Sequence, residues 1–145
     1  MGYVIALIGA GIVGVGVALE PTINSGLGKL ITPRLATLHS FIVGTLIIFI
    51  MNFMSGGFKE YRGILKAPPY LWIGGIIGTI IVYVGARVTT VLGVATTLTV
   101  MVSVQLLTSM VIDHFGLYGV EKVTMDLGRV AGIVLMIIAV KLIVK

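Results

Sequence analysis

The chain has no cysteine among its 145 residues, and Asp, Glu, Lys and Arg together make up only 10% of it. The lack of cysteine excludes a disulfide framework, cysteine-based zinc sites and a thiol nucleophile. The sequence also lacks a G-x-x-x-x-G-K-[ST] phosphate-binding loop, an HExxH motif and paired carboxylates, so neither an ATP-driven pump nor an enzyme is expected. We accordingly expect no catalytic residues, no cofactor and no metal site.

Apolar residues dominate what is present. They make up 58% of the chain, and the mean hydropathy is +1.19, which is too high for a soluble domain of this length. The net charge of +5 comes from ten Lys and Arg residues that are spread over the segment ends, so nucleic acid is not an expected partner. No basic residue precedes the first hydrophobic stretch, which favours a retained helix over a cleaved signal peptide. The sequence predicts an integral membrane protein embedded in the lipid bilayer.

Five hydrophobic stretches are long enough to cross a bilayer, which takes roughly 20 residues. They are 3–24, 34–55, 69–87, 92–113 and 127–144. The expected fold class is therefore all-α: a polytopic membrane protein in which residues 1–145 form a single five-helix transmembrane domain. Because the number of spans is odd, the two ends of the chain are expected on opposite sides of the membrane.

Glycine, proline and polar residues punctuate these stretches. Asn24-Ser25-Gly26 is expected to end the first helix, and Gly85 to Gly93 to form a short turn between the third and the fourth. The interval from Ser55 to Pro69 is expected to be an exposed loop that contains a short amphipathic piece.

One carboxylate, Glu20, lies within the first hydrophobic stretch. A charged side chain is costly at membrane depth, so it marks a functional site there. On a helical wheel it shares its stripe with glycines, and Pro21 beside it cannot donate to the carbonyl of Val17, which predicts a kink at the acid. The alternative is that Glu20 lies near the lipid headgroups and pairs with Lys29 or Arg34.

Further polar and aromatic side chains complete the candidate site. Those expected to bind substrate or proton are Glu20, Asn24, Ser40, Trp72, Tyr83, Thr96 and Gln105. Asn24 follows the acid by one helical turn, and we expect Asn24 and Gln105 to orient it or to contact the substrate. Plainer alternatives remain, because Trp72 can anchor the membrane interface and hydroxyls such as that of Thr96 can bond to carbonyls of their own helix.

Two features predict how helices pack. Three glycines of the third stretch share one face, which should lie against another helix; they are Gly74, Gly78 and Gly85. The fourth stretch ends at Asp113, where a negative charge is adverse to the helix dipole. Asp113 is therefore expected to have a partner, with Lys122 and Arg129 as the candidates.

Basic residues are balanced between the two sides of the predicted topology. One side carries Lys59, Arg62, Lys66, Lys122 and Arg129, and the other carries Lys29, Arg34, Arg87, Lys141 and Lys145. Loop Lys and Arg normally fix orientation, so a chain without bias is a candidate to insert both ways. Two oppositely inserted copies would form an antiparallel dimer of ten helices, the geometry of inverted-repeat transporters.

Several short runs of the sequence form an ordered set: Glu20 to Asn24, Leu27-Gly28, Ser40 to Thr45, Pro69, Trp72 to Gly78, Gln105 to Leu107 and Asp113 to Gly116. Together these runs resemble the YdcZ-like family of small bacterial inner-membrane proteins. The resemblance implies membership of the drug/metabolite transporter superfamily, a multi-pass location in the bacterial inner membrane, and function as antiparallel pairs of one chain or of two partner chains. The family commonly has Gln where this chain has Glu20, so proton coupling does not follow from the resemblance.

We expect a small-molecule secondary transporter that is coupled to protons through Glu20. A carboxylate favours a cation or a proton as its ligand, so small organic cations and amphipathic metabolites are the expected substrates. The alternatives are a scaffold or helper subunit that does not transport, and a passive channel lined by the hydroxyls of the fourth stretch.

Overall fold

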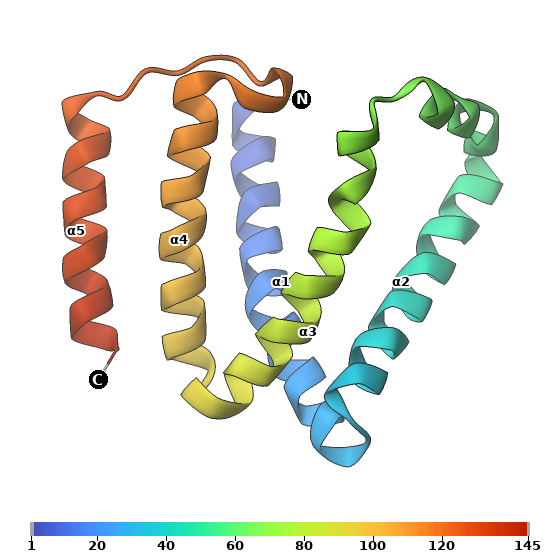
Figure 1. Cartoon of the computed structure of the whole chain (residues 1–145), viewed down its shortest axis with the longest axis horizontal. Coiled ribbons are helices and arrows are strands. Elements are labelled where there is room, and N and C mark those ends of the chain that lie inside the picture. The colour runs from blue at the N-terminus through green and yellow to red at the C-terminus, as the bar shows by residue number, and fades with distance from the viewer. Residues whose placement is uncertain (1, 145) are drawn as a thin grey trace. The chain divides into compact units, whose positions relative to one another are not determined.

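The computed structural model describes residues 2–144, and all regular structure in that range is helical. The chain divides into two compact units, residues 1–91 and residues 92–145. Figure 1 shows the helices coloured along the chain from α1 to α5.

The first unit begins with a tight helical hairpin. Its two helices are α1, Tyr3–Leu30, and α2, Pro33–Ser55. The Thr32 hydroxyl accepts a hydrogen bond from a backbone N–H of the first turn of α2, and Pro33 opens that turn, where its missing N–H is no loss. A Cβ atom at Gly28 would lie 3.3 Å from the Pro33 Cα. The two helices therefore meet closely at the turn, and the predicted start of the second span is confirmed.

α1 is longer than the sequence predicts. The expectation that it ends at Asn24-Ser25-Gly26 is wrong, because the helix continues to Leu30. Asn24 and Ser25 are buried and bond to residues distant in sequence: Ser40 donates to the Asn24 side chain, and the Ser25 and Thr90 hydroxyls lie 2.8 Å apart. Polar residues that often end a helix here join helices to one another.

Pro21 lies inside α1 without ending it. Its ring leaves the Val17 carbonyl without the usual partner, and the Thr22 hydroxyl donates to the neighbouring Ala18 carbonyl at 2.9 Å. Figure 1 shows α1 changing direction in its second half, in line with the kink that the proline predicts.

A 3₁₀-helical segment, η1, covers Gly57–Lys66 and matches the short amphipathic piece expected between the second and third spans. It follows a reversal at Gly56, whose φ of +71° favours glycine. A Cβ at Gly57 would lie 2.7 Å from the Asn52 Oδ1, so a larger residue there would require the Asn52 side chain to move. The ring centre of Phe58 lies 5.1 Å from that of Phe49. η1 thus folds back against the end of α2.

The third predicted span is divided between η2, Pro69–Ile73, and α3, Gly74–Leu92. The expected turn from Gly85 to Gly93 is wrong. α3 runs to Leu92, and the break comes at Gly93, whose φ is +79°. Gly85 is buried within α3, where it packs against another helix and does not form a turn.

Two of the three glycines expected to pack against another helix do so. A Cβ at Gly85 would lie 3.8 Å from the Cβ of Pro21 in α1, and one at Gly78 would lie 4.0 Å from the ring of Phe41 in α2. Nothing lies within 4 Å of a Cβ at Gly74. α3 therefore packs against the α1–α2 hairpin through Gly78 and Gly85.

The second unit is a pair of helices joined by an irregular connection. Its elements are α4, Val94–Phe115, the short η3, Leu117–Gly119, and α5, Leu127–Ile143. The Nη1 of Arg129 lies 3.4 Å from the Oδ2 of Asp113, which confirms a partner for this carboxylate and selects Arg129 over Lys122. Asp126 caps α5 by accepting a hydrogen bond from the Arg129 backbone N–H at 2.8 Å.

Four stretches within residues 2–144 are helical, long and apolar enough to cross a membrane. They are Tyr3–Leu30, Pro33–Ser55, Pro69–Leu92 and Val94–Phe115. The all-helical, multi-pass class of fold is thereby confirmed. α5 has 17 residues, fewer than the roughly 20 that a bilayer takes, so the fifth span stays a prediction.

Burial is distributed as in a protein whose surroundings are lipid. Within residues 2–144, the buried apolar residues are Pro21, Ala36, Gly85 and Ala86, and the buried polar ones are Asn24, Ser25, Thr37, Thr89 and Thr97. Large aliphatic side chains along every α-helix are exposed. Small and polar side chains thus make the contacts between helices, as is typical where lipid removes the hydrophobic drive to bury large ones.

Candidate functional site

The main hollow of the first unit is a groove of about 870 Å³. Its lining residues are Glu20, Ser40, Phe41, Gly44, Thr45, Ile48, Phe49, Asn52, Gly57, Phe58, Glu60, Tyr61 and Val82. α2 supplies most of this wall, and η1 closes one end. Both charged residues of the lining are carboxylates, and no lysine or arginine contributes to it. The groove is therefore suited to a positively charged, partly apolar ligand.

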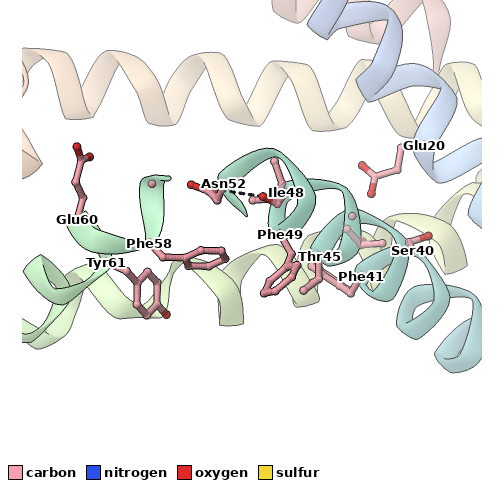
Figure 2. A pocket seen from close by; sticks show the side chains of 13 residues that line it. Glu20, Ser40, Phe41, Thr45, Ile48, Phe49, Asn52, Phe58, Glu60 and Tyr61 are labelled. Carbon is pink, nitrogen blue, oxygen red and sulfur yellow. Dashed lines mark hydrogen bonds between the residues drawn. The ribbon is translucent and has the colours of Figure 1, made fainter. Parts of the chain in front are cut away.

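Glu20 lies at one end of the groove. In Figure 2 the Glu20 carboxylate lies next to α2 on the side of Ser40, and Glu60 lies at the opposite end of the groove. The ion pair formed within residues 2–144 is that of Arg129 with Asp113. An ion pair of Glu20 with Lys29 or Arg34 is absent from residues 2–144, and whether Glu20 lies at the headgroups or deeper stays a prediction.

Asn24 and Ser40 are brought together, but only Ser40 lines the groove. The Ser40 hydroxyl donates to the Asn24 Oδ1 at 2.5 Å. Asn24 itself is 2% exposed and lines a separate cavity of about 70 Å³ beside Lys29 and Thr90. Its Nδ2 has no hydrogen-bond partner in the described part of the chain. Asn24 thus holds Ser40 in place and does not itself line the groove beside Glu20.

Tyr83 belongs to another hollow of the first unit, of about 280 Å³. It shares this hollow with Arg34 and Thr79. The Nη1 of Arg87 donates to the Tyr83 hydroxyl at 3.1 Å, and the Arg87 guanidinium lies 5.7 Å from the ring centre. Trp72, in η2, is 53% exposed and lines none of these three hollows. The basic surroundings of Tyr83 contrast with the acidic groove.

Thr96 and Gln105 lie on α4, in the second unit. Thr96 is half-buried and Gln105 is exposed. Most hydroxyls of this helix bond to their own backbone: the donors are Thr97, Thr99, Ser103, Thr108 and Ser109, and the acceptors are the carbonyls of Gly93, Ala95, Thr99, Val104 and Leu106. These five hydroxyls are satisfied by backbone carbonyls of α4 and its cap, whereas the role of Thr96 stays a prediction.

Sequence reasoning missed the aromatic and acidic end of the groove. Phe49, Phe58, Glu60 and Tyr61 line it there, and η1 brings the last three back over α2. The signal in the sequence was Gly56-Gly57, which permits the reversal. No three metal-binding side chains of the His, Cys, Asp or Glu type come together in residues 2–144.

Comparison with known proteins gives one family. Residues 5–142 match the family model described as "Putative inner membrane exporter, YdcZ". No curated protein and no solved structure matches the chain. The match covers nearly the whole chain, and its description is that of a transporter and not of an enzyme. The resemblance seen in the sequence is thereby confirmed: the chain belongs to the YdcZ family and is a multi-pass inner-membrane protein.

Proposed function

We propose that this protein is a proton-coupled secondary transporter of small organic cations, with Glu20 as the group that binds proton and substrate in turn. The observation that carries the proposal is an unpaired carboxylate in an apolar helix that lines a groove of about 870 Å³. The description of the family as an exporter supports outward transport of the substrate against an inward flow of protons.

The position of Glu20 along α1 supports membrane depth. α1 ends at Leu30, ten residues further on, which corresponds to about 15 Å along the helix axis. Lys29, in the last turn, is suited to the headgroup level. Because the apolar layer is about 30 Å thick, a Lys29 at its surface leaves Glu20 near the middle, where transporters of paired halves bind their substrates.

The chemistry is competition between two ligands for one carboxylate. In this proposal the Glu20 carboxylate holds either a proton or a cation, and not both at once. An arriving cation stabilises the carboxylate and displaces the proton. A protein that exposes this group to one side of the membrane at a time exchanges protons for cations.

We further propose that two copies of the chain, inserted in opposite directions, assemble into the working transporter. The equal numbers of basic residues on the two sides support it, as does the small interior of a single copy. In this assembly α5 is the fifth span. Its 17 residues extend over about 26 Å, and a helix that short is accommodated by local thinning of the bilayer.

Uptake by proteoliposomes tests the coupling. Purified protein in vesicles with an imposed proton gradient should accumulate tetraphenylphosphonium, and Glu20→Gln should abolish this accumulation while the protein still folds. Glu121→Gln, which removes a carboxylate from the loop before α5, is the matched control and should transport normally. Rapid passive conductance would indicate a channel, and neither activity a helper subunit.

Labelling of single cysteines tests the assembly, and the chain has no cysteine of its own to interfere. Cysteines introduced at Ser55 and Lys145, on opposite sides in the five-span topology, should each be partly labelled by an impermeant reagent in intact cells. Labelling at one position alone would show a fixed orientation and a separate partner chain.

A further inference from the structure

We propose that the groove is a two-point site for elongated dications, in which Glu20 holds one positive charge and Glu60 the other. The inference deepens the proposed function, on which it rests for the role of the groove. It assigns a binding role to Glu60, which lies outside the hydrophobic stretches.

The two carboxylates lie at opposite ends of the groove. Figure 2 shows Glu20 at one end and Glu60 at the other, with Ile48 and Phe49 between them. The Ser40 hydroxyl of α2 bonds to Asn24 of α1, so these two residues lie at the same height. Because α1 and α2 run antiparallel, Glu20, one turn before Asn24, lies at the height of Gly44, one turn after Ser40. Asn52 is the last residue of α2 that lines the groove, and it lies about 12 Å further along the helix axis. A ligand that touches both acids must therefore be elongated.

The wall between the acids is apolar and aromatic. Phe41 and Phe49 of α2, with Phe58 and Tyr61 of η1, contribute rings to it. Ring faces attract ammonium groups, most strongly where water is excluded, and also pack against an alkyl linker. Lysine and arginine are missing from the lining. Charge and shape thus favour an alkyl chain with a cationic group at each end.

The fold holds Glu60 at the groove. The reversal at Gly56 and the tight approach of Gly57 to Asn52 fix where η1 begins. The Phe58 ring packs at 5.1 Å and a tilt of 52° on the Phe49 ring, which anchors the segment two residues before Glu60. Glu60 has no ion pair within residues 2–144. Its carboxylate is therefore positioned and unpaired, like that of Glu20.

Calorimetric titration of the purified full chain tests the proposal. The ligands are decamethonium, which carries a trimethylammonium group at each end of a ten-carbon chain, and an analogue in which a neutral tert-butyl group replaces one of them. Decamethonium should bind about threefold to fivefold more tightly, the upper range for a partly exposed ion pair. Glu60→Gln should remove this preference and leave the binding of the analogue unchanged, and added salt should weaken the preference.

Two outcomes would overturn the inference. One is an equal preference for decamethonium in the wild type and in Glu60→Gln. The other is equally tight binding of a compact dication with a two-carbon linker, which cannot reach both acids. Glu121→Gln is the control for a general loss of negative charge. Because these are binding measurements, they stand apart from proton-driven uptake: loss of uptake with the preference intact would contradict the proposed function alone.

Discussion

Two hydrogen bonds between side chains join helices to one another in the first unit, whereas the hydroxyl hydrogen bonds of the second unit stay on α4 and its N-terminal cap. In the first unit, Asn24 meets Ser40, and Ser25 meets Thr90. In the second, five hydroxyls of α4 bond to carbonyls of α4 or of its cap residue, and an ion pair between Arg129 and Asp113, near the C-terminal end of α4, links α4 to α5. Polar side chains thus link helices in the first unit, whereas those of α4 are satisfied locally.

The contrast assigns different roles to the units. The hydrogen bond from Ser40 to Asn24 restrains the rotation of α1 relative to α2, and Glu20 lies one turn before Asn24 on α1. A helix whose hydroxyls are satisfied internally presents an apolar surface suited to lipid or to another copy. Substitutions that disturb helix contacts should therefore be most damaging in the first unit.

The largest effect is expected at Gly85. Its buried position against Pro21 leaves no room for a large side chain, so Gly85→Leu should lower the free energy of unfolding by about 1–3 kcal/mol. Reversible unfolding in mixed micelles measures this change. Gly74→Leu, in the same helix but with open space around it, is the matched control, and equal losses at both positions would undercut the packing of α3 through Gly85.

A smaller effect is expected from hydroxyls, and its size should depend on the unit. Ser40→Ala removes a hydrogen bond between helices and leaves the buried Asn24 without its remaining partner, so stability should fall by about 1 kcal/mol. Thr99→Ala removes a bond within α4 and should change stability by only a few tenths of a kcal/mol. The same unfolding assay compares them. A larger loss for Thr99→Ala would reverse the comparison.

The smallest effect is expected at the ion pair of the second unit. The side chains of Arg129 and Asp113 are 29% and 38% exposed, so water and salt screen their attraction, and Asp113→Asn should cost less than about 1 kcal/mol. This cost should shrink further in high salt. An effect that is insensitive to salt would mean that Asp113 acts through its hydrogen bonds instead.

Local chemistry predicted some helix ends and not others. Thr32 suits the N-cap and Pro33 the first turn of a helix because of their own side chains, independently of distant residues. The start of α2 could therefore be predicted from the sequence. Asn24 and Gly85 also carry the chemistry of helix ends, yet both lie inside helices. They serve contacts with residues far along the chain, and such contacts leave no mark in the local sequence.

The candidate site was predicted in part for the same reason. Glu20 could be identified because a carboxylate in an apolar stretch stands out by itself. Glu60 could not, since its role depends on η1 folding back over α2. Tyr83 shares a face with Trp72 by helical periodicity, but periodicity does not show that Arg87 binds its hydroxyl.

Proton release on ligand binding tests the central claim, that one carboxylate serves proton and cation in turn. Purified protein in weakly buffered solution at a series of pH values is mixed with saturating tetraphenylphosphonium, and the released protons are measured with a pH-sensitive dye. The account predicts release from the wild type, none from Glu20→Gln, and weaker binding to the wild type as the pH falls. Undiminished release from Glu20→Gln, or wild-type binding that does not change with pH, would contradict it.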